Sequence, residues 1–358
     1  MPLRTCLVVW VLLVLGCRSG ETGSDEMHIG LVGDPIRPTV LRQFPASDRA
    51  TIDQVEGDTL GLYRPQDIGV IGERVVVLDT GNDRAVVFDT LLQPLALIGR
   101  SGGGPGELRA PFRMATDGEG ELWVGDITNR RLTAYSLTGA YLRSLALPVS
   151  IAPFTLMSDG TIVIGAPTER HFAARLDSGG AHQSFAPRPI GEEVEPRAFL
   201  PTPLLARTSG DTIHVFDNET GALMKYDPEG HFIVRRLLPE PVLAAALQRR
   251  SGTKEQLEGG GLRVLDIPLA KSLKASDDDH LLLMVVVDDV VGLLIDAHSY
   301  AARSIVAQGA AQDARWLRSA RSAALAQNRI YLVADQHVVV YELSSQRRSD
   351  RTAAMRGQ

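Results

Sequence analysis

The sequence of 358 residues has few cysteines, few aromatic residues and no excess of positive charge. A hydrophobic share of 44% with 22% charged residues describes a folded chain and excludes a disordered or collagen-like one. A formal net charge of −6 and a pI of about 5.8 argue against a general nucleic-acid binder, which usually carries a basic patch. The same charge disfavours acidic lipid surfaces as partners. We therefore expect no nucleic-acid partner.

Long apolar runs are also scarce. Residues 6–16 form an apolar run that is too short to cross a bilayer, which needs about 20 such residues. Because Arg4 precedes the run and small residues end it, the run is typical of an export signal. A second apolar stretch, residues 280–295, carries Asp288 and Asp289 at its centre, where each would cost about 2.5–3.5 kcal/mol in a bilayer. We predict a two-stranded hairpin there.

The end of the export signal is more specific. Val14-Leu15-Gly16-Cys17 resembles the lipobox of bacterial lipoproteins. The resemblance implies a signal peptide at residues 1–16, lipidation of Cys17, and a location in the bacterial cell envelope, anchored by lipid and facing the periplasm or the outer membrane. Two acyl chains on one cysteine give stable anchoring. Cys6 would leave with the signal, so the mature chain would hold neither a disulfide nor a thiolate metal site.

The residues that follow divide into a tether, a repeat region and a tail. Residues 17–35 are rich in glycine, serine and acid and predict a flexible tether from Cys17. Residues 36–344 repeat, and the polar, basic residues 345–358 predict a disordered tail. An aromatic or large aliphatic residue before a turn residue recurs at intervals of 41–50 residues, apart from one interval of 69. The instances are Phe88-Asp89, Tyr135-Ser136, Leu176-Asp177, Tyr226-Asp227, Ile295-Asp296 and Tyr341-Glu342.

A repeat of 40–50 residues indicates a propeller. Inside each unit, short alternating runs are separated by Gly, Asp and Asn clusters, which predicts four antiparallel strands. Six units fit the chain, but the sixth ends before its fourth strand, and an unassigned strand at Thr39–Phe44 precedes the first unit. We therefore predict an all-β, six-bladed β-propeller of four-stranded antiparallel blades, closed by an N-terminal strand that completes the last blade. We expect a monomer.

The long interval holds an insert at about 239–266. It contains two runs of good helix formers separated by Ser251-Gly252. We predict a short helix or a flap over one mouth of the propeller, with simple loop elaboration as the alternative.

Two loops share the pattern D-x-x-N-x-R after an apolar strand, 47 residues apart, and a proline begins each unit (Pro65 and Pro111). The pattern resembles the NHL-repeat group of six-bladed β-propellers, most clearly over residues 60–148. In the structural interpretation, Asp accepts backbone N–H bonds, Asn tolerates a left-handed turn, and Arg bridges to a neighbouring loop. In the other, these residues form an exposed ligand surface. The loop-face candidates are Asp79, Asn82, Arg84, Asp126, Asn129 and Arg131.

Four charged residues near the starts of innermost strands are candidates for ligand binding in the central funnel: Arg64, Asp67, Arg113 and Arg207. Interblade salt bridges are the alternative role for them. The eight histidines show no metal-ligand spacing, and we predict no metal site and no cofactor. A calcium ion held by acids that follow the second strands is the alternative. Those acids are Asp79, Asp126, Asp217, Asp288, Asp289 and Asp335.

No nucleophile constellation or cofactor fingerprint stands out, so we name no catalytic residue. The sequence favours a membrane-anchored extracytoplasmic propeller that acts as a binding module for a protein, peptide or glycan. The opposing hypothesis is a metal-dependent hydrolase or lyase that uses calcium or zinc at the propeller centre. The resemblance implies a gluconolactonase-like or amidating-lyase-like type for such an enzyme. A purely structural envelope component is the third reading.

Overall fold

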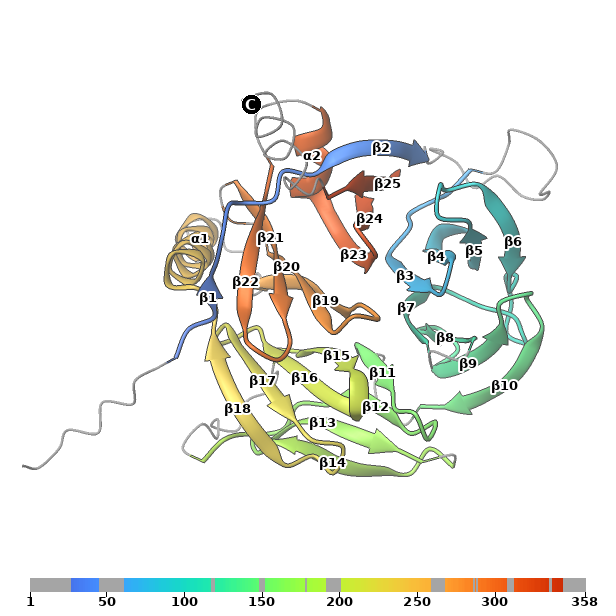
Figure 1. Ribbon diagram of the computed structural model, residues 1–358. Helices are drawn as coiled ribbons and strands as arrows, with labels where there is room; N and C mark the ends of the chain where they lie inside the picture. Colours follow the sequence, from blue (N-terminus) through green and yellow to red (C-terminus); the bar gives the residue numbers. More distant parts are fainter. Residues whose placement is uncertain are drawn as a thin grey trace, which may run out of the picture.

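The computed structural model describes residues 27–44, 61–116, 120–147, 152–177, 179–190, 201–258, 268–285, 287, 289–307, 312–334 and 337–343. Cys17 and the tail predicted at 345–358 lie outside these residues. Most of the described chain forms short strands in six sheets, which surround one axis (Figure 1). Within each sheet, consecutive strands pair antiparallel. The predicted fold class is confirmed.

The first three blades follow the chain outward from the axis. Blade 1 consists of β3 (Asp67–Ile71), β4 (Arg74–Asp79), β5 (Arg84–Phe88) and β6 (Pro94–Ile98). Blade 2 consists of β7 (Pro111–Thr116), β8 (Glu121–Asp126), β9 (Arg131–Ser136) and β10 (Tyr141–Ala146). Blade 3 consists of β11 (Phe154–Leu156), β12 (Ile162–Gly165), β13 (His171–Leu176) and β14 (His182–Pro187). Short 3-10 turns connect β4 to β5 at Thr80–Asn82 and β15 to β16 at Ser209–Asp211.

The last three blades include the ring closure. Blade 4 consists of β15 (Leu204–Thr208), β16 (Thr212–Asp217), β17 (Ala222–Tyr226) and β18 (Phe232–Leu237). Blade 5 consists of β19 (Ala270–Ala275), β20 (His280–Val285), β21 (Val290–Asp296) and β22 (Ala301–Val306). Blade 6 consists of β23 (Ala320–Ala326), β24 (Arg329–Ala334), β25 (His337–Glu342) and the N-terminal β2 (Thr39–Phe44). The β2 strand pairs antiparallel with β25, as predicted from the missing fourth strand.

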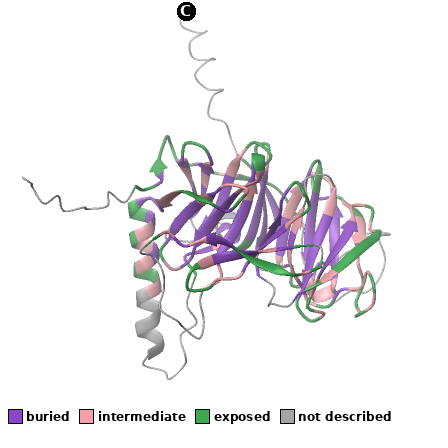
Figure 2. Ribbon diagram, turned by 90° about the horizontal axis from the view of Figure 1, so that it is seen from below, coloured by how far each residue is buried: buried purple, intermediate pink, exposed green. Residues whose placement is uncertain are grey.

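The inner strands meet around the axis. Each inner strand contacts the next, in the cyclic order β3, β7, β11, β15, β19, β23 and back to β3. The second and third strands of the blades are mostly buried, and exposed residues gather on the turns (Figure 2). Outermost strands such as β10 are exposed along most of their length. The apolar stretch 280–295 forms the predicted hairpin, β20 and β21, and its side chains pack against both neighbouring blades, 4 and 6. Among the described residues, no helix is long and apolar enough to cross a membrane.

Part of the segment predicted as a flexible tether belongs to the folded body. The strand β1 (Gly30–Leu31) runs parallel to β22 and adds a fifth strand to blade 5. Ile29 and Ile36 on either side of it are buried, and the backbone N–H of Ile29 donates to the carbonyl of Leu237 in blade 4. The chain is therefore fixed to the propeller from Met27 onward, nine residues earlier than the boundary drawn from composition.

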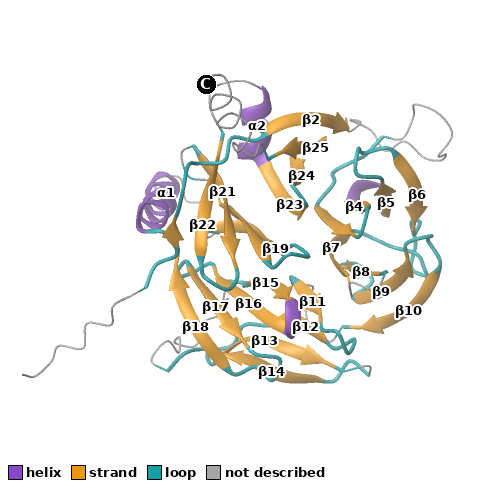
Figure 3. Cartoon of the chain, in the orientation of Figure 1, coloured by secondary structure: helices purple, strands orange, loops and turns teal. Residues whose placement is uncertain are grey.

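Two helices lie outside the sheets. The insert forms α1 (Glu240–Glu258), whose first turns pack Val242 and Ala246 onto the core of blades 4 and 5. The predicted helix is confirmed, but it lies at the outer edge of the propeller and not over a mouth of the funnel (Figure 3). The shorter α2 (Gln312–Ser319) precedes blade 6 and buries Trp316 and Leu317. Its apolar residues share a cluster with Ile36, which ties the N-terminal segment to the last blade.

Candidate functional site

Two cavities lie on the propeller axis, one at each end of the inner strands. The larger has a volume of about 400 Å³, and its lining includes residues from all six inner strands. It reaches the turns that follow the inner strands of blades 3, 4 and 5, so it opens on the face where those strands end. The smaller has a volume of about 30 Å³ and is lined mainly by residues near the starts of the inner strands. Met114, Phe154, Leu205, Leu273 and Lys274 line both cavities and form the wall between them.

The lining of the large cavity is asymmetric. Blades 1, 2 and 6 contribute mostly small or apolar residues: Gly69, Val70, Met114, Ala115, Thr116, Ala324 and Leu325. Blades 3, 4 and 5 contribute hydroxyl groups and charges of both signs: Thr155, Ser158, Arg207, Thr208, Ser209, Asp211, Lys274, Ser276, Asp277 and Asp279. The charged side chains of this lining therefore lie on one side of the ring, where Phe154, Leu205, Ala206, Leu273 and Ala275 also line the cavity.

Asp67 is the central ionic group of the propeller. It is buried, at 1% exposure, and its two carboxylate oxygens accept hydrogen bonds from the Ser322 hydroxyl at 2.6 Å and the Met114 N–H at 2.9 Å. The Lys274 Nζ lies 3.2 Å from the same carboxylate. Burial by itself would raise the pKa of Asp67, but Lys274, Arg113 and these hydrogen bonds together lower it. The cluster therefore joins blades 1, 2, 5 and 6 around a permanent carboxylate.

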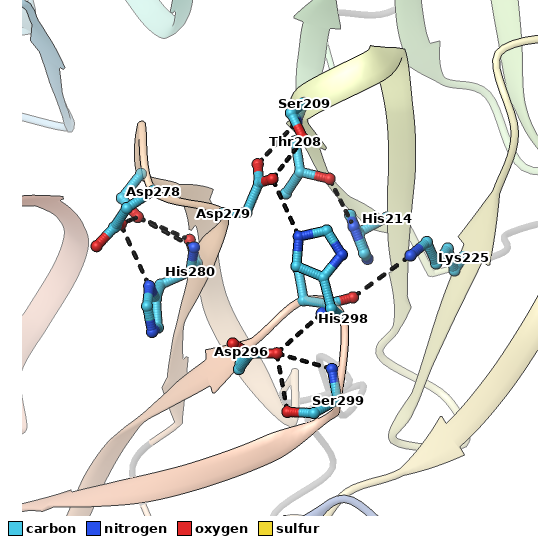
Figure 4. A network of polar contacts seen from close by, with 12 residues as sticks. Thr208, Ser209, His214, Lys225, Asp278, Asp279, His280, Asp296, His298 and Ser299 are labelled. Carbon is cyan, nitrogen blue, oxygen red and sulfur yellow. Dashed lines mark hydrogen bonds and ion pairs between the residues drawn. The ribbon is translucent and has the colours of Figure 1, made fainter.

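The rim of the large cavity is held by a repeated interblade contact. Asp211 of blade 4 accepts hydrogen bonds from the backbone N–H of Ser158 in blade 3 at 2.8 Å and from its hydroxyl. Asp279 of blade 5 accepts the same two bonds from Ser209 of blade 4 (Figure 4). Both aspartates have positive φ, at 55° and 58°, a conformation that aspartate tolerates better than most residues. These turns link blades 3, 4 and 5 in sequence.

Serine, aspartate and histidine meet on this rim without forming a catalytic triad. The His298 Nε2 lies 3.2 Å from Asp279 Oδ2, the oxygen that also accepts the Ser209 hydroxyl (Figure 4). A triad needs the histidine between the serine and the carboxylate, so that the imidazole receives the serine proton. Here the carboxylate stands between the two, and the arrangement fixes the turn instead of activating a nucleophile.

His214 on β16 is fully buried behind this rim. Its Nε2 lies 3.0 Å from the Thr208 hydroxyl, and its Nδ1 has no partner among the described residues. Burial, aided by the nearby Lys225, lowers the pKa of His214 to about 3. The imidazole is therefore neutral in the folded protein at all physiological pH values.

This histidine predicts a loss of stability in mild acid. In the unfolded chain the His214 imidazole becomes protonated below about pH 6.5, whereas in the folded protein it stays neutral down to about pH 3. The contribution of neutral His214 to the free energy of unfolding is therefore fully present above pH 6.5 and is lost as the pH falls from 6.5 towards 3. We expect His214 to account for about 2–3 kcal/mol of lost unfolding free energy between pH 7 and pH 4.5. Urea unfolding at both pH values measures it.

Two variants separate the contribution of His214 from that of the other titrating groups. His214→Gln should lose correspondingly less stability over this pH interval than the parent protein, whatever its stability at pH 7. The matched substitution of the exposed His182 should leave the loss in place. An unaltered pH dependence in His214→Gln would contradict the assignment.

The D-x-x-N-x-R loops make the contacts of the structural interpretation. Asp79 accepts hydrogen bonds from the backbone N–H of Tyr63 at 2.6 Å, from Asn82 Nδ2 at 2.8 Å and from Arg84 Nε at 2.8 Å. Arg84 also donates to the carbonyl of Gly61 at 3.1 Å, which bridges to the preceding loop. Burial raises the pKa of Asp79, although these three hydrogen bonds oppose the shift.

The second loop repeats the arrangement one blade later. Asp126 accepts the backbone N–H of Arg109 at 2.8 Å and the side-chain amide of Asn129 at 2.6 Å. Arg131 donates to the carbonyls of Gly104 at 2.6 Å and Glu107 at 2.7 Å. In both loops the left-handed residue is the one after the asparagine, Asp83 at φ 53° and Arg130 at φ 51°, so the expected role of asparagine in the turn is wrong.

The four funnel candidates separate in the structure. Asp67 and Arg113 line the small cavity, and Arg207 lines the large one, where it lies 3.1 Å from Asp211. Arg64 is exposed in the loop before β3, with φ 53°. Several polar residues that line the two axial cavities were not predicted from the sequence: Lys271, Lys274, Asp279, Arg321 and Ser322. The polar residues of AKSLKA, the sequence of β19, were the available signal for the two lysines.

Asp67 and the acids that follow the second strands do not fit a central divalent ion. Asp67 lies among cations and already accepts four hydrogen bonds or ion pairs, including one from the N–H of Ile68. Three of the acids after second strands, Asp79, Asp126 and Asp217, are buried and accept hydrogen bonds from their own loops. Asp289 forms an ion pair with Arg318. Asp288 and Asp335 lie outside the described residues.

One group in the described part of the chain has three side chains placed to share an ion: Asp227, Glu229 and His231. It lies on the turn between β17 and β18, near the outer rim, and not on the axis. Asp227 already accepts the backbone N–H of His231 at 2.7 Å, which stabilises the turn itself. This group therefore offers no support for a metal at the propeller centre.

No protein-family model matches this sequence, and no curated protein matches it. Solved structures do. A Bacteroides fragilis protein described as exported superposes with a TM-score of 0.55 and 10% identity, over 89% of this chain and 98% of that chain. A gluconolactonase from Xanthomonas campestris gives a TM-score of 0.51 and 13% identity, over 88% and 97% of the two chains. They share the propeller fold with this chain.

Virginiamycin B lyase from Staphylococcus aureus is also similar, with a TM-score of 0.49 and 11% identity over 85% of this chain and 89% of that chain. At these identities the likeness extends to the fold alone. The resemblance to the NHL-repeat group is accordingly supported as a six-bladed propeller, and the activities of these proteins are not transferred to this one.

Proposed function

We propose that this protein is a lipid-anchored extracytoplasmic binding module that takes a segment of peptide or glycan into the large axial cavity. The observation that carries the proposal is the cavity itself. At about 400 Å³ it falls within the range of ligand pockets, and all six inner strands line it. Closure of the ring fixes those strands, so the cavity is preorganised.

The two walls of the cavity suit such a ligand. Sugars and peptides both present hydrogen-bonding edges beside apolar faces. The Thr155 hydroxyl can donate and accept on one side, the hydroxyl oxygens of Ser158 and Ser276 can accept there, and Val70 and Leu325 supply apolar contact on the other. The charges of the lining are largely engaged, because Asp211 pairs with Arg207, Asp279 accepts hydrogen bonds from Ser209, and Lys274 in the wall pairs with Asp67. Neutral or weakly charged segments therefore match this cavity best.

Filling the cavity tests the proposal. Ala115 on β7 lines the cavity and is partly exposed, so Ala115→Leu would place three additional carbon atoms near the bound segment. We expect binding of a neutral probe, cellotriose or N-acetylated and amidated trialanine, to weaken at least tenfold by calorimetry. Ala140→Leu, at an exposed turn between β9 and β10, is the matched control and should bind as the parent does.

A complementary measurement separates binding from metal-dependent chemistry. Failure of the parent protein to bind either probe, or equal binding by Ala115→Leu, would count against the proposal. Elemental analysis of the protein after dialysis and a melting scan in EDTA address the alternative. One equivalent of calcium or zinc, together with a lower melting temperature in EDTA, would favour a metal-dependent hydrolase or lyase instead.

A further inference from the structure

The small axial cavity is strongly cationic. Its lining contains four basic side chains, Arg113 from β7, Lys271 and Lys274 from β19, and Arg321 from β23. Among the described residues that line it, Asp67 is the one acidic residue, which leaves these residues with a formal excess of three positive charges. The large cavity has no such excess, because its lining holds three aspartates against two basic residues. The two ends of the axis therefore differ in charge.

Two of these cations also contact uncharged groups. Arg113 donates to the carbonyl of Phe112 at 3.2 Å and lies 4.1 Å from the centre of the Phe112 ring. Lys271 donates to the carbonyl of Ala320 at 3.1 Å. Burial lowers the pKa of Arg113, and the charge of Asp67 opposes that shift. The loss of solvation of the guanidinium therefore outweighs its attraction to this one carboxylate.

Backbone irregularities coincide with this cavity. The inner strands β7, β19 and β23 each shift register near their starts, between Pro111 and Arg113, between Ala270 and Ser272, and between Ala320 and Ser322. The residues passed over in β19 and β23 are Lys271 and Arg321. Bulges change the direction of a side chain and are frequent beside binding sites. Two of the three bulges therefore bring a basic residue to the axis against the ordinary alternation of a strand, and the third falls on Phe112, directly before Arg113.

A buried hydroxyl adds an independent observation. Ser272 lines the same cavity and is only 6% exposed, and its Oγ has no hydrogen-bond partner in the described structure. Buried hydroxyls are normally hydrogen-bonded, and an unsatisfied one costs about 1–3 kcal/mol. A ligand oxygen at this cavity would give it an acceptor.

We infer that the small cavity binds the carboxylate group of a ligand. Its volume of about 30 Å³ holds about two water-sized groups, since one such group needs at least 10–15 Å³. The two oxygens of a carboxylate match that space, and a guanidinium recognises them with paired N–H donors. The remainder of the ligand would extend outward from the face where the inner strands start. This site is separate from the large cavity and goes beyond the binding proposed for it.

Calorimetric titration of the mature protein with paired probes tests the inference. N-acetylglycine carries a carboxylate where its amide carries a neutral carboxamide. Glucuronate carries a carboxylate where glucose carries a hydroxymethyl group. The first pair represents a peptide terminus and the second a sugar acid, so the two pairs distinguish these ligands. We expect saturable binding of at least one acid, no binding of its neutral counterpart, and weaker binding as salt rises. Equal behaviour of an acid and its neutral counterpart would overturn the inference.

Variants locate the site. Arg321 is exposed, so Arg321→Gln should fold, and it should weaken binding of the acid at least tenfold. Arg109→Gln removes an exposed arginine from the loop just before β7 and should bind as the parent does. If both variants bind equally, the carboxylate site is not at this cavity. Ala115→Leu should leave acid binding intact, so failure of this inference and failure of the proposed function give different results.

Discussion

Asp67→Ala is expected to lower the free energy of unfolding by about 3–5 kcal/mol, the usual cost of removing one partner from a buried ion pair. The variant leaves the Lys274 ammonium at the axis without its carboxylate, while the Ser322 hydroxyl and the Met114 N–H lose their acceptor. Because the cluster joins four blades, its loss weakens the centre of the ring and not a single hairpin. Urea unfolding monitored by circular dichroism measures the change.

Substitution of Lys274, the partner of Asp67 in the ion pair, provides the control for this prediction. In Asp67→Ala with Lys274→Met, the uncompensated charge is gone, and much of the lost stability should return, as a double-mutant cycle would show. Asp159→Ala, at an exposed turn of blade 3, should cost less than about 1 kcal/mol. A loss below about 1 kcal/mol in Asp67→Ala, with no recovery in the double variant, would show that the pair contributes little.

Cys17→Ser is expected to move the protein from the membrane fraction to the soluble extracytoplasmic fraction. The proposed anchor consists of two acyl chains on this one thiol, and burial of each methylene contributes about 0.8 kcal/mol. Fractionation of a bacterial host that produces the full chain, with mass spectrometry of the mature N-terminus, measures the effect. Cys6→Ser changes the cysteine that lies within the predicted signal peptide, and this variant should stay membrane-bound and lipidated at Cys17. Retention of Cys17→Ser in membranes would refute the anchor.

The bound N-terminal segment limits how far the anchored propeller would stand from the bilayer. Ten residue steps separate Cys17 from Met27, where attachment to the propeller begins. A chain spans at most about 3.6 Å per residue, so the proposed anchor would lie within about 36 Å of that point. The edge between blades 4 and 5, where Met27 and Leu237 meet, would therefore stay near the membrane.

The fold was predictable because its signals are local and repeated. Turn residues after each apolar strand mark the blades, and the absence of a fourth strand in the last unit identified Thr39–Phe44 as its partner. The N-terminal boundary was not predictable from composition. The residues before Met27 are polar and glycine-rich, and β1 itself is only two residues long. What fixes this segment is pairing with β22 and burial of Ile29 and Ile36, neither of which depends on a local pattern.

The axial residues were predictable only in part. Asp67 and Arg113 stand near strand starts, which sufficed to place them at the funnel. Lys271 and Arg321 reach the same cavity through bulges, which break the alternation that sequence reasoning relies on. The rim aspartates Asp211 and Asp279 occupy left-handed positions where glycine is the usual choice, so their pairing with serines of the preceding blade becomes evident only when the blades are assembled.

Ring closure has a consequence for how the chain would fold if it is exported as proposed. Thr39 pairs with Glu342, so the first long strand to emerge must wait for nearly the whole chain before it finds its partner. Contacts between residues so distant in sequence slow folding, because the entropy of closing the loop is lost before the contacts form. During translocation, an incomplete last blade would expose an unpaired edge, which is prone to aggregation. An exported chain of this design would depend on protection of that edge until its final strand has crossed the membrane.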